Sequence, residues 1–255
     1  MTIAVVTLNP RGRRIARLLR QRVPEADLFL PTALADQDSP FSDLRELVAD
    51  LFSKYQGIVF IMPVGIVVRM IARHVRDKHT DPAIVVMDEA GRYAISLLSG
   101  HEGGANRFAL RVANATGAEP VITTAAEVSR SIVVGVGARR GVSHQAVRQS
   151  IASALESVGS NLDSVRWVAT IEEKASEPGI VAACAALGLS IRTFSKERIA
   201  RFQGDYQRSA FVKEKIGVEG VCEPCVLLSG KEMRLLLPKT ASGGVTVAVG
   251  KEAST

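Results

Sequence analysis

Polar residues and glycines gather in one segment, LLSGHEGGAN, which interrupts an otherwise apolar sequence. His101 lies between Gly100 and the pair Gly103 and Gly104, and a histidine that titrates near neutral pH can serve as a general acid or base. The N–H groups of Gly103 and Gly104 are candidates to stabilise an oxyanion on a carbonyl under attack. Asn106 follows in the first turn of a helix, where we expect it to fix the loop beside bound substrate. The alternative is a structural turn in which backbone groups satisfy His101.

Two carboxylates, Asp88 and Glu89, come directly after the preceding apolar strand, and they are the reserve candidates for the general base. The glycine-rich segment itself leaves the carboxyl end of a strand and re-enters a helix. Open α/β sheets bind ligands at the carboxyl ends of their strands, and helix amino ends attract anions. We therefore expect this loop to face the substrate.

Three arginines stand at or near two other strand-to-helix junctions, MPVGIVVR and VGVGARRGVS. We expect Arg69, Arg139 and Arg140 to bind carboxylates, because guanidinium groups form paired hydrogen bonds with them. The second junction imitates a dinucleotide fingerprint, but the third glycine is missing and two arginines would crowd a pyrophosphate. Solvated arginines on a tight turn are the alternative interpretation.

Strands and helices alternate along the chain. β-branched apolar runs predict strands, and apolar residues at helical spacing between them predict helices, which together indicate mainly parallel, covered sheets. The pattern restarts near residue 131, and the chain ends in two strands joined by a Gly-Gly turn. The prediction is an α/β fold with two domains, 1–128 and 131–255. Each is expected to hold a mainly parallel sheet flanked by helices, with a cleft between the domains.

Composition limits the function classes. The 255 residues are 47% hydrophobic and carry a net charge of +6, which suits a packed protein with nucleic acid, an anionic membrane surface or a polycarboxylate as ligand. The longest apolar run, 57–68, is too short to span a bilayer, and no secretory signal is recognised. Cys222 and Cys225 lack a second ligand pair for zinc, so we expect reduced cysteines, no metal site and a cytoplasmic location.

Residues 64–124 contain the elements GIVVR, DKHTDPA, MDEAGR, LLSGHEGGAN and PVITT, and the second half contains VGVGARRGVS, ATIEEKASEPGI and LLLPKTASGGVTVAV. In these elements the chain closely resembles the CbiG family of cobalamin biosynthesis over most of its length. It departs from the family in two respects. The middle region that many members carry is nearly absent, and TTAAE replaces the usual T-D ending, which leaves a role for Glu127 open.

The resemblance implies a cobalt-precorrin-5A hydrolase. In that reaction water opens a lactone on the macrocycle, and the former bridge carbon leaves with its methyl group as acetaldehyde. The implied ligand is an anionic tetrapyrrole, with no nucleic acid or membrane partner, and no cofactor is needed because cobalt arrives inside the substrate. A homodimer and hand-over to other pathway enzymes stay open. So do two other functions, a non-catalytic corrinoid carrier and a nucleotide-binding regulator.

Overall fold

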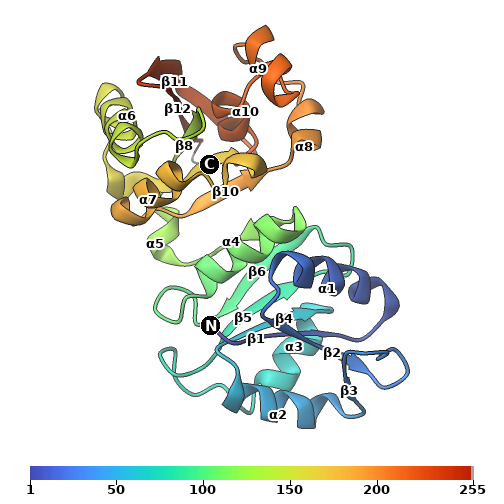
Figure 1. Ribbon diagram of the computed structural model, residues 1–255. Helices are drawn as coiled ribbons and strands as arrows, with labels where there is room; N and C mark the ends of the chain where they lie inside the picture. Colours follow the sequence, from blue (N-terminus) through green and yellow to red (C-terminus); the bar gives the residue numbers. More distant parts are fainter. Residues whose placement is uncertain (254–255) are drawn as a thin grey trace. The chain divides into compact units, whose positions relative to one another are not determined.

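The computed structural model describes residues 1–253, and the chain divides into two compact units at Thr124–Ala125. The division lies a few residues before the predicted one. Each unit contains its own sheet, and both sheets are covered by helices (Figure 1). No helix within residues 1–253 combines the length and the apolar character needed to cross a membrane.

The first unit contains a seven-stranded sheet in the order β3-β2-β1-β4-β5-β6-β7. Every neighbouring pair is parallel except β5 and β6, so the predicted mainly parallel sheet is confirmed here. The strands are β1 (Ile3–Thr7), β2 (Ala26–Pro31), β3 (Ser39–Phe41), β4 (Gly57–Ile61), β5 (Ala83–Met87), β6 (Tyr93–Leu98) and β7 (Glu119–Val121). The helices are α1 (Pro10–Arg22), α2 (Leu44–Lys54), α3 (Val64–Ile71) and α4 (Ala105–Thr116).

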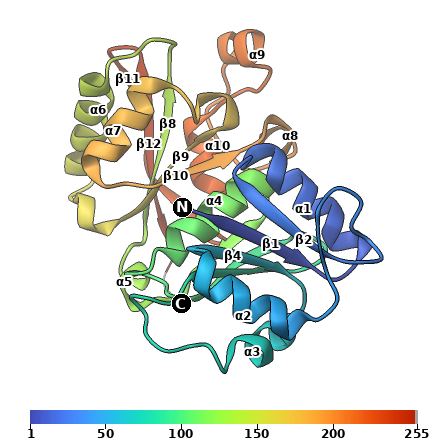
Figure 2. The same cartoon turned by 60° about the horizontal axis from the view of Figure 1, so that its bottom comes forward.

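Helices cover both faces of this sheet, as Figure 2 shows. Alternate residues of β1 point into different cores, because side chains of a strand alternate between its two faces. Ile3 and Val5 pack in the core beneath α1 and α4, whereas Ala4 and Val6 pack in the core of α2 and α3. This double burial explains why the strands read as continuous apolar runs.

The second unit contains a five-stranded sheet in the order β10-β9-β8-β12-β11. Its strands are β8 (Ile132–Ala138), β9 (Val165–Ile171), β10 (Ile191–Phe194), β11 (Met233–Ser242) and β12 (Val245–Glu252). Its helices are α5 (Ala125–Val128), α6 (His144–Ser157), α7 (Pro178–Leu187), α8 (Lys196–Ala200), α9 (Ala210–Ile216) and α10 (Cys222–Leu227). Short 3-10 turns lie at Leu162–Ser164 and Glu172–Lys174.

This second sheet is mixed rather than mainly parallel, which corrects the prediction for this unit. The strands β8, β9 and β10 are parallel, but β12 runs antiparallel to both β8 and β11. The cause is the two-residue turn between β11 and β12, where Gly243 and Gly244 have φ of 57° and 81°. Two consecutive residues with positive φ form the tight hairpin turn that joins antiparallel neighbours.

Candidate functional site

The glycine-rich loop lies between β6 and α4, at residues 99–104. Because β6 is antiparallel to β5, with Met87 opposite Ala94 and Ile84 opposite Leu98, the carboxyl end of β6 lies beside the amino end of β5. The loop therefore lies at the amino edge of the parallel strands β1, β4 and β5. This corrects the expectation that it occupies the carboxyl edge, where open α/β sheets bind ligands.

The loop rests directly on the segment that precedes β5. Ser99 has a φ of 60°, rare for a residue other than glycine, and its Oγ donates to the carbonyl of Asp81 at 3.1 Å. At Gly103 an added Cβ would lie 2.3 Å from Ser99 Cβ and 3.1 Å from the carbonyl oxygen of Lys78, so only glycine fits. Gly104 has a φ of 83° and forms the N-cap of α4. These constraints hold the loop in one conformation.

Asn106 connects the loop to the rest of the unit. Its side chain is buried, accepts a hydrogen bond from Ser96 Oγ at 2.9 Å and donates one to Thr124 Oγ1 at 2.9 Å. Its own N–H donates to the carbonyl of Gly100, where an added Cβ would lie 2.8 Å from Thr124 Cγ2. Both side-chain groups are engaged, so Asn106 has the geometry of a positioning residue.

A groove of about 700 Å³ opens beside the loop. Gly103 and Gly104 line it, and within residues 1–253 their N–H groups donate to no acceptor, as an oxyanion site requires. The other lining residues come from the amino edge of the sheet, α2 and α4: Met1, Phe52, Ser53, Lys54, Tyr55, Gln56, His79, Thr80, Asp81, Pro82, Glu102, Arg107, Phe108 and Arg111.

The two histidines near the loop differ in their relation to the groove. His101 is exposed and lies next to the lining residue Glu102 but does not itself line the groove. His79, which is also exposed, does line it. A signal for this lies in the short turn between the runs that form β5 and β6, because a hairpin brings the residues before its first strand beside those after its second.

Glu102 forms an ion pair with Lys78, whose Nζ lies 2.9 Å from the Glu102 carboxylate. The hydrogen bond from Lys78 lowers the pKa of Glu102 below its ordinary value. Glu102 is therefore ionised at neutral pH and cannot act as the acid.

Asp88 organises the β5–β6 turn at the other end of the hairpin. Its carboxylate accepts hydrogen bonds from the N–H groups of Arg92 and Tyr93 at 2.7 and 3.0 Å and from Arg92 Nε at 2.9 Å. Partial burial by itself would raise the pKa of Asp88. The hydrogen bonds to its carboxylate have the larger effect, so the pKa lies below its ordinary value. A carboxylate with so many donors is a weak base.

Glu89 accepts a hydrogen bond from Asn9 Nδ2 at 2.5 Å. Asn9 follows β1, so this contact lies at the carboxyl edge of the sheet. The five residues of β5 separate that edge from the loop, which is roughly 16 Å at 3.3 Å per residue. The structure therefore does not bring Asp88 or Glu89 together with His101, and one reacting bond cannot lie within reach of both groups.

The three predicted carboxylate-binding arginines are exposed; Arg69 lies in the first unit, and Arg139 and Arg140 lie in the second. Arg69 belongs to α3 and donates from Nη1 to the carbonyl of Gly65 at 3.2 Å. Arg139 and Arg140 follow β8, and the side chain of Arg139 lies over Gly244. Their convergence on one cleft stays a prediction.

Metal-ligating side chains do not gather in threes anywhere in residues 1–253. The three cysteines are free and buried. Burial raises the pKa of Cys184 to about 12 and that of Cys222 to about 11, and it raises the pKa of Cys225 well above its ordinary value. Such thiols are neutral and unreactive at physiological pH.

The fold and the loop define a two-unit α/β protein with a glycine-rich turn over a groove. Family models assign both halves: "Cobalamin synthesis G N-terminal" matches residues 46–127, and "Cobalamin synthesis G C-terminus" matches residues 132–250. The chain belongs to the CbiG family. Only residues 128–131 separate the two matches, in agreement with the expected near-absence of a middle region.

Known proteins resemble the chain over part or all of its length. A protein named "Cobalt-precorrin-5A hydrolase" from Priestia megaterium is 40% identical over 144 residues, 54% of this chain and 38% of the relative. A protein of the same name from Salmonella typhimurium is 24% identical over an alignment of 343 residues, which covers 98% of this chain and 97% of the relative. The crystal structure of a "putative cobalamin biosynthesis protein G homolog" from Sulfolobus solfataricus is 19% identical, with a TM-score of 0.40, over 98% of this chain and 97% of that one.

Proposed function

We propose that this protein is a cobalt-precorrin-5A hydrolase of cobalamin biosynthesis. The proposal rests on how much of the chain matches the family and its members. Both CbiG halves are present, and the alignment with the relative of that name from Salmonella typhimurium spans nearly the whole of both proteins. The chain carries almost none of the family's middle region, so the assignment rests on the two halves.

In the proposed reaction, water adds to the lactone carbonyl and the ring C–O bond breaks. The oxygen freed from the lactone stays on the bridge carbon as a hydroxyl group. That hydroxyl then loses its proton as the carbon–carbon bond to the macrocycle breaks, the electron pair of that bond stays with the macrocycle, and the bridge carbon leaves with its methyl group as acetaldehyde. Two groups assist such a step: a base that takes a proton from water, and donors that stabilise the tetrahedral oxyanion. Cobalt belongs to the substrate, and no further cofactor takes part in the proposal.

The loop beside the groove offers both groups. Gly103 and Gly104 present N–H groups without an acceptor in the described residues, and we assign them to the oxyanion. His101 is assigned to the proton transfer, since it is exposed and adjacent to the groove. His79 is the second candidate because it lines the groove. Asp88 and Glu89, the reserve candidates for the general base, lie at the opposite edge of the sheet and are not part of this site.

The substrate carries many carboxylates, and Arg69, Arg139 and Arg140 are proposed to bind them. A charge-assisted hydrogen bond shielded from water contributes roughly 1.5–3 kcal/mol and an exposed one less. Replacing both Arg139 and Arg140 by alanine is then expected to weaken binding in a salt-dependent manner. A cytoplasmic location, a homodimer and hand-over to partner enzymes remain predictions.

The test is to incubate the purified protein with cobalt-precorrin-5A and to trap acetaldehyde. A hydrolase releases about one equivalent per macrocycle converted. A corrinoid carrier binds the same compound and releases none, which would overturn the proposal. Heat-inactivated protein controls for spontaneous breakdown of the lactone.

A further inference from the structure

Helix α1 carries an unusual charge for its place in the fold. Six of its thirteen residues are arginines and none is acidic, and three of the arginines lie in or near the first turn. The amino end of a helix is its positive end, so cations there are unfavourable. Residues that break a local rule without a compensating contact are expected at functional sites.

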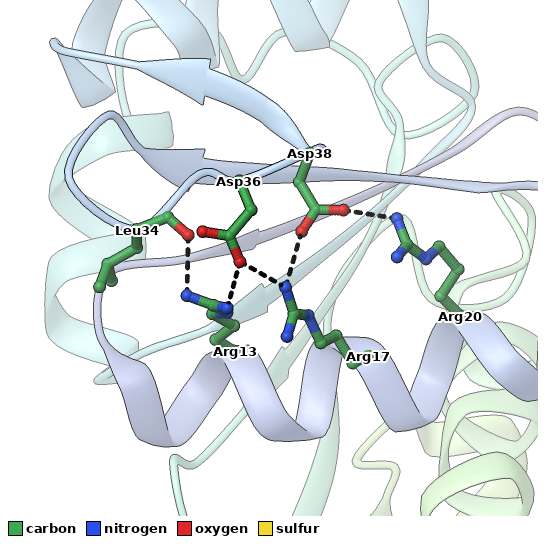
Figure 3. Close-up of polar contacts among 6 residues, drawn as sticks. All are labelled: Arg13, Arg17, Arg20, Leu34, Asp36 and Asp38. Carbon is green, nitrogen blue, oxygen red and sulfur yellow. Dashed lines mark hydrogen bonds and ion pairs between the residues drawn. The ribbon is translucent and has the colours of Figure 1, made fainter.

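One face of α1 does have compensating contacts. Arg13 and Arg17 bind Asp36 at 2.6 and 3.1 Å, and Arg20 binds Asp38 at 2.5 Å (Figure 3). Both aspartates belong to the connection between β2 and β3, which these ion pairs hold against the helix. The side chain of Asp38 is almost fully buried. The charge on this face therefore serves the fold.

The remaining arginines near the start of the helix have no such partners. Arg11 and Arg14 are exposed, and within residues 1–253 neither side chain forms a hydrogen bond or an ion pair. They lie three residues apart, so they are neighbours on the helix surface. A hollow of about 340 Å³ opens between them, lined by Pro10, Arg11, Arg13, Arg14 and Arg17.

The first turn of α1, which contributes Pro10 and Arg11 to the hollow, follows the carboxyl end of β1. The chain runs from β1 to β2 on one side and returns to β4 on the other side of β1, so the strand order reverses at β1. In open α/β sheets the crevice outside the carboxyl ends at such a reversal binds ligands.

We propose that Arg11 and Arg14 form a docking surface for the carboxylates of an anionic tetrapyrrole, separate from the groove beside Gly103. The choice of a tetrapyrrole rests on the proposed function. Two neighbouring guanidinium groups match two neighbouring carboxylate side chains on one macrocycle. The hollow offers no aromatic ring on which a nucleic-acid base would stack, which disfavours single-stranded nucleic acid.

The test measures binding of uroporphyrin, which carries eight carboxylates, by its change in fluorescence on titration with protein. The variant is Arg11→Ala with Arg14→Ala. The matched control is Arg45→Ala with Arg148→Ala, which removes two exposed arginines from α2 and α6 and gives the same change in net charge. Melting curves establish that both variants fold.

We expect the Arg11/Arg14 variant to lose about 10-fold in affinity, or ~1.4 kcal/mol, and the control to stay within about twofold. Coproporphyrin, with four carboxylates, is expected to bind more weakly, and millimolar phosphate is expected not to displace uroporphyrin. Equal losses of uroporphyrin affinity in both variants would show that only the overall positive charge of the protein matters, and this would overturn the proposal. Displacement by phosphate at that concentration would overturn it too, because the surface would then bind any small anion.

The outcome is separable from that of the proposed function, since uroporphyrin binding needs no lactone hydrolysis. Acetaldehyde release by the wild type together with unchanged porphyrin binding by the Arg11/Arg14 variant refutes the docking surface alone. If the wild type releases no acetaldehyde but the Arg11/Arg14 variant shows the expected loss of porphyrin affinity, the hydrolase alone is refuted.

Discussion

Replacing Gly103 by alanine tests how tightly the loop geometry controls catalysis. The new Cβ would lie 2.3 Å from Ser99 Cβ and 2.8 Å from the Ser99 carbonyl oxygen. Ordinary carbon contacts are about 3.5–4.0 Å, so the loop must shift by roughly 1 Å or more. Overpacking of this kind costs about 1–3 kcal/mol of stability. A displacement of 1 Å in a catalytic group lowers turnover by ~10²-fold.

Gly104→Ala is the matched control. Its φ of 83° makes an alanine strained by about 1–2 kcal/mol, but no heavy atom lies within 4 Å of the added Cβ. We therefore expect a similar loss of stability with the loop in place and turnover reduced far less.

Urea denaturation gives the stability of each variant, and trapped acetaldehyde gives the turnover. Two results would contradict a catalytic role for the loop geometry: wild-type turnover in Gly103→Ala, or a loss of turnover in both variants that is proportional to their loss of stability. In the first case the close contact does not position a catalytic group. In the second, the loop acts only through the fold.

Three further predictions concern stability and reactivity. Asn106→Ala removes two partly buried hydrogen bonds and should cost about 2–3 kcal/mol in urea denaturation, against about 1 kcal/mol for Ser96→Ala. Equal costs would contradict the role given to Asn106. Because the pKa of Asp88 is lowered in the folded protein, its stabilisation is present above the unfolded value of about 4 and is lost as the pH falls through the folded value. Asp88→Asn should thus be less stable than the wild type at pH 7 with the difference vanishing in acid, and a constant difference would contradict this. Cys222 and Cys225 should resist alkylation at pH 8 until urea unfolds the chain, because burial raises the pKa of both thiols; rapid labelling of the folded protein would show the opposite.

Local sequence patterns predicted most of the elements because the central strands of the first sheet are buried on both faces. The runs that became β1, β4 and β5 are apolar throughout, and their periodicity could not belong to a surface helix. Strand direction was harder to predict. The Gly243-Gly244 turn already implied an antiparallel end to the second sheet, yet the alternation of strands and helices was extended over the whole unit.

The residue types of the candidate site could be predicted from the sequence, but the edge of the sheet on which the site lies could not. His101, Gly103 and Gly104 were recognised from residue chemistry, and two of the three line a groove. Their edge of the sheet depends on the reversal of β6, which moves the loop away from Asp88 and brings His79 beside it. Such proximity follows from the antiparallel pairing of β5 with β6, and the short turn between them is its one signal in the sequence.

In the proposed function, lactone hydrolysis takes place beside the loop with His101 as the proton-transfer group. The most direct test is the single-turnover rate of acetaldehyde release by His101→Ala, measured at saturating cobalt-precorrin-5A alongside the wild type. A positioned acid or base contributes ~10²–10⁴ in rate, so we predict a fall of that size with substrate affinity retained. Release at the wild-type rate would contradict the claim, and the role would then pass to His79 in the groove.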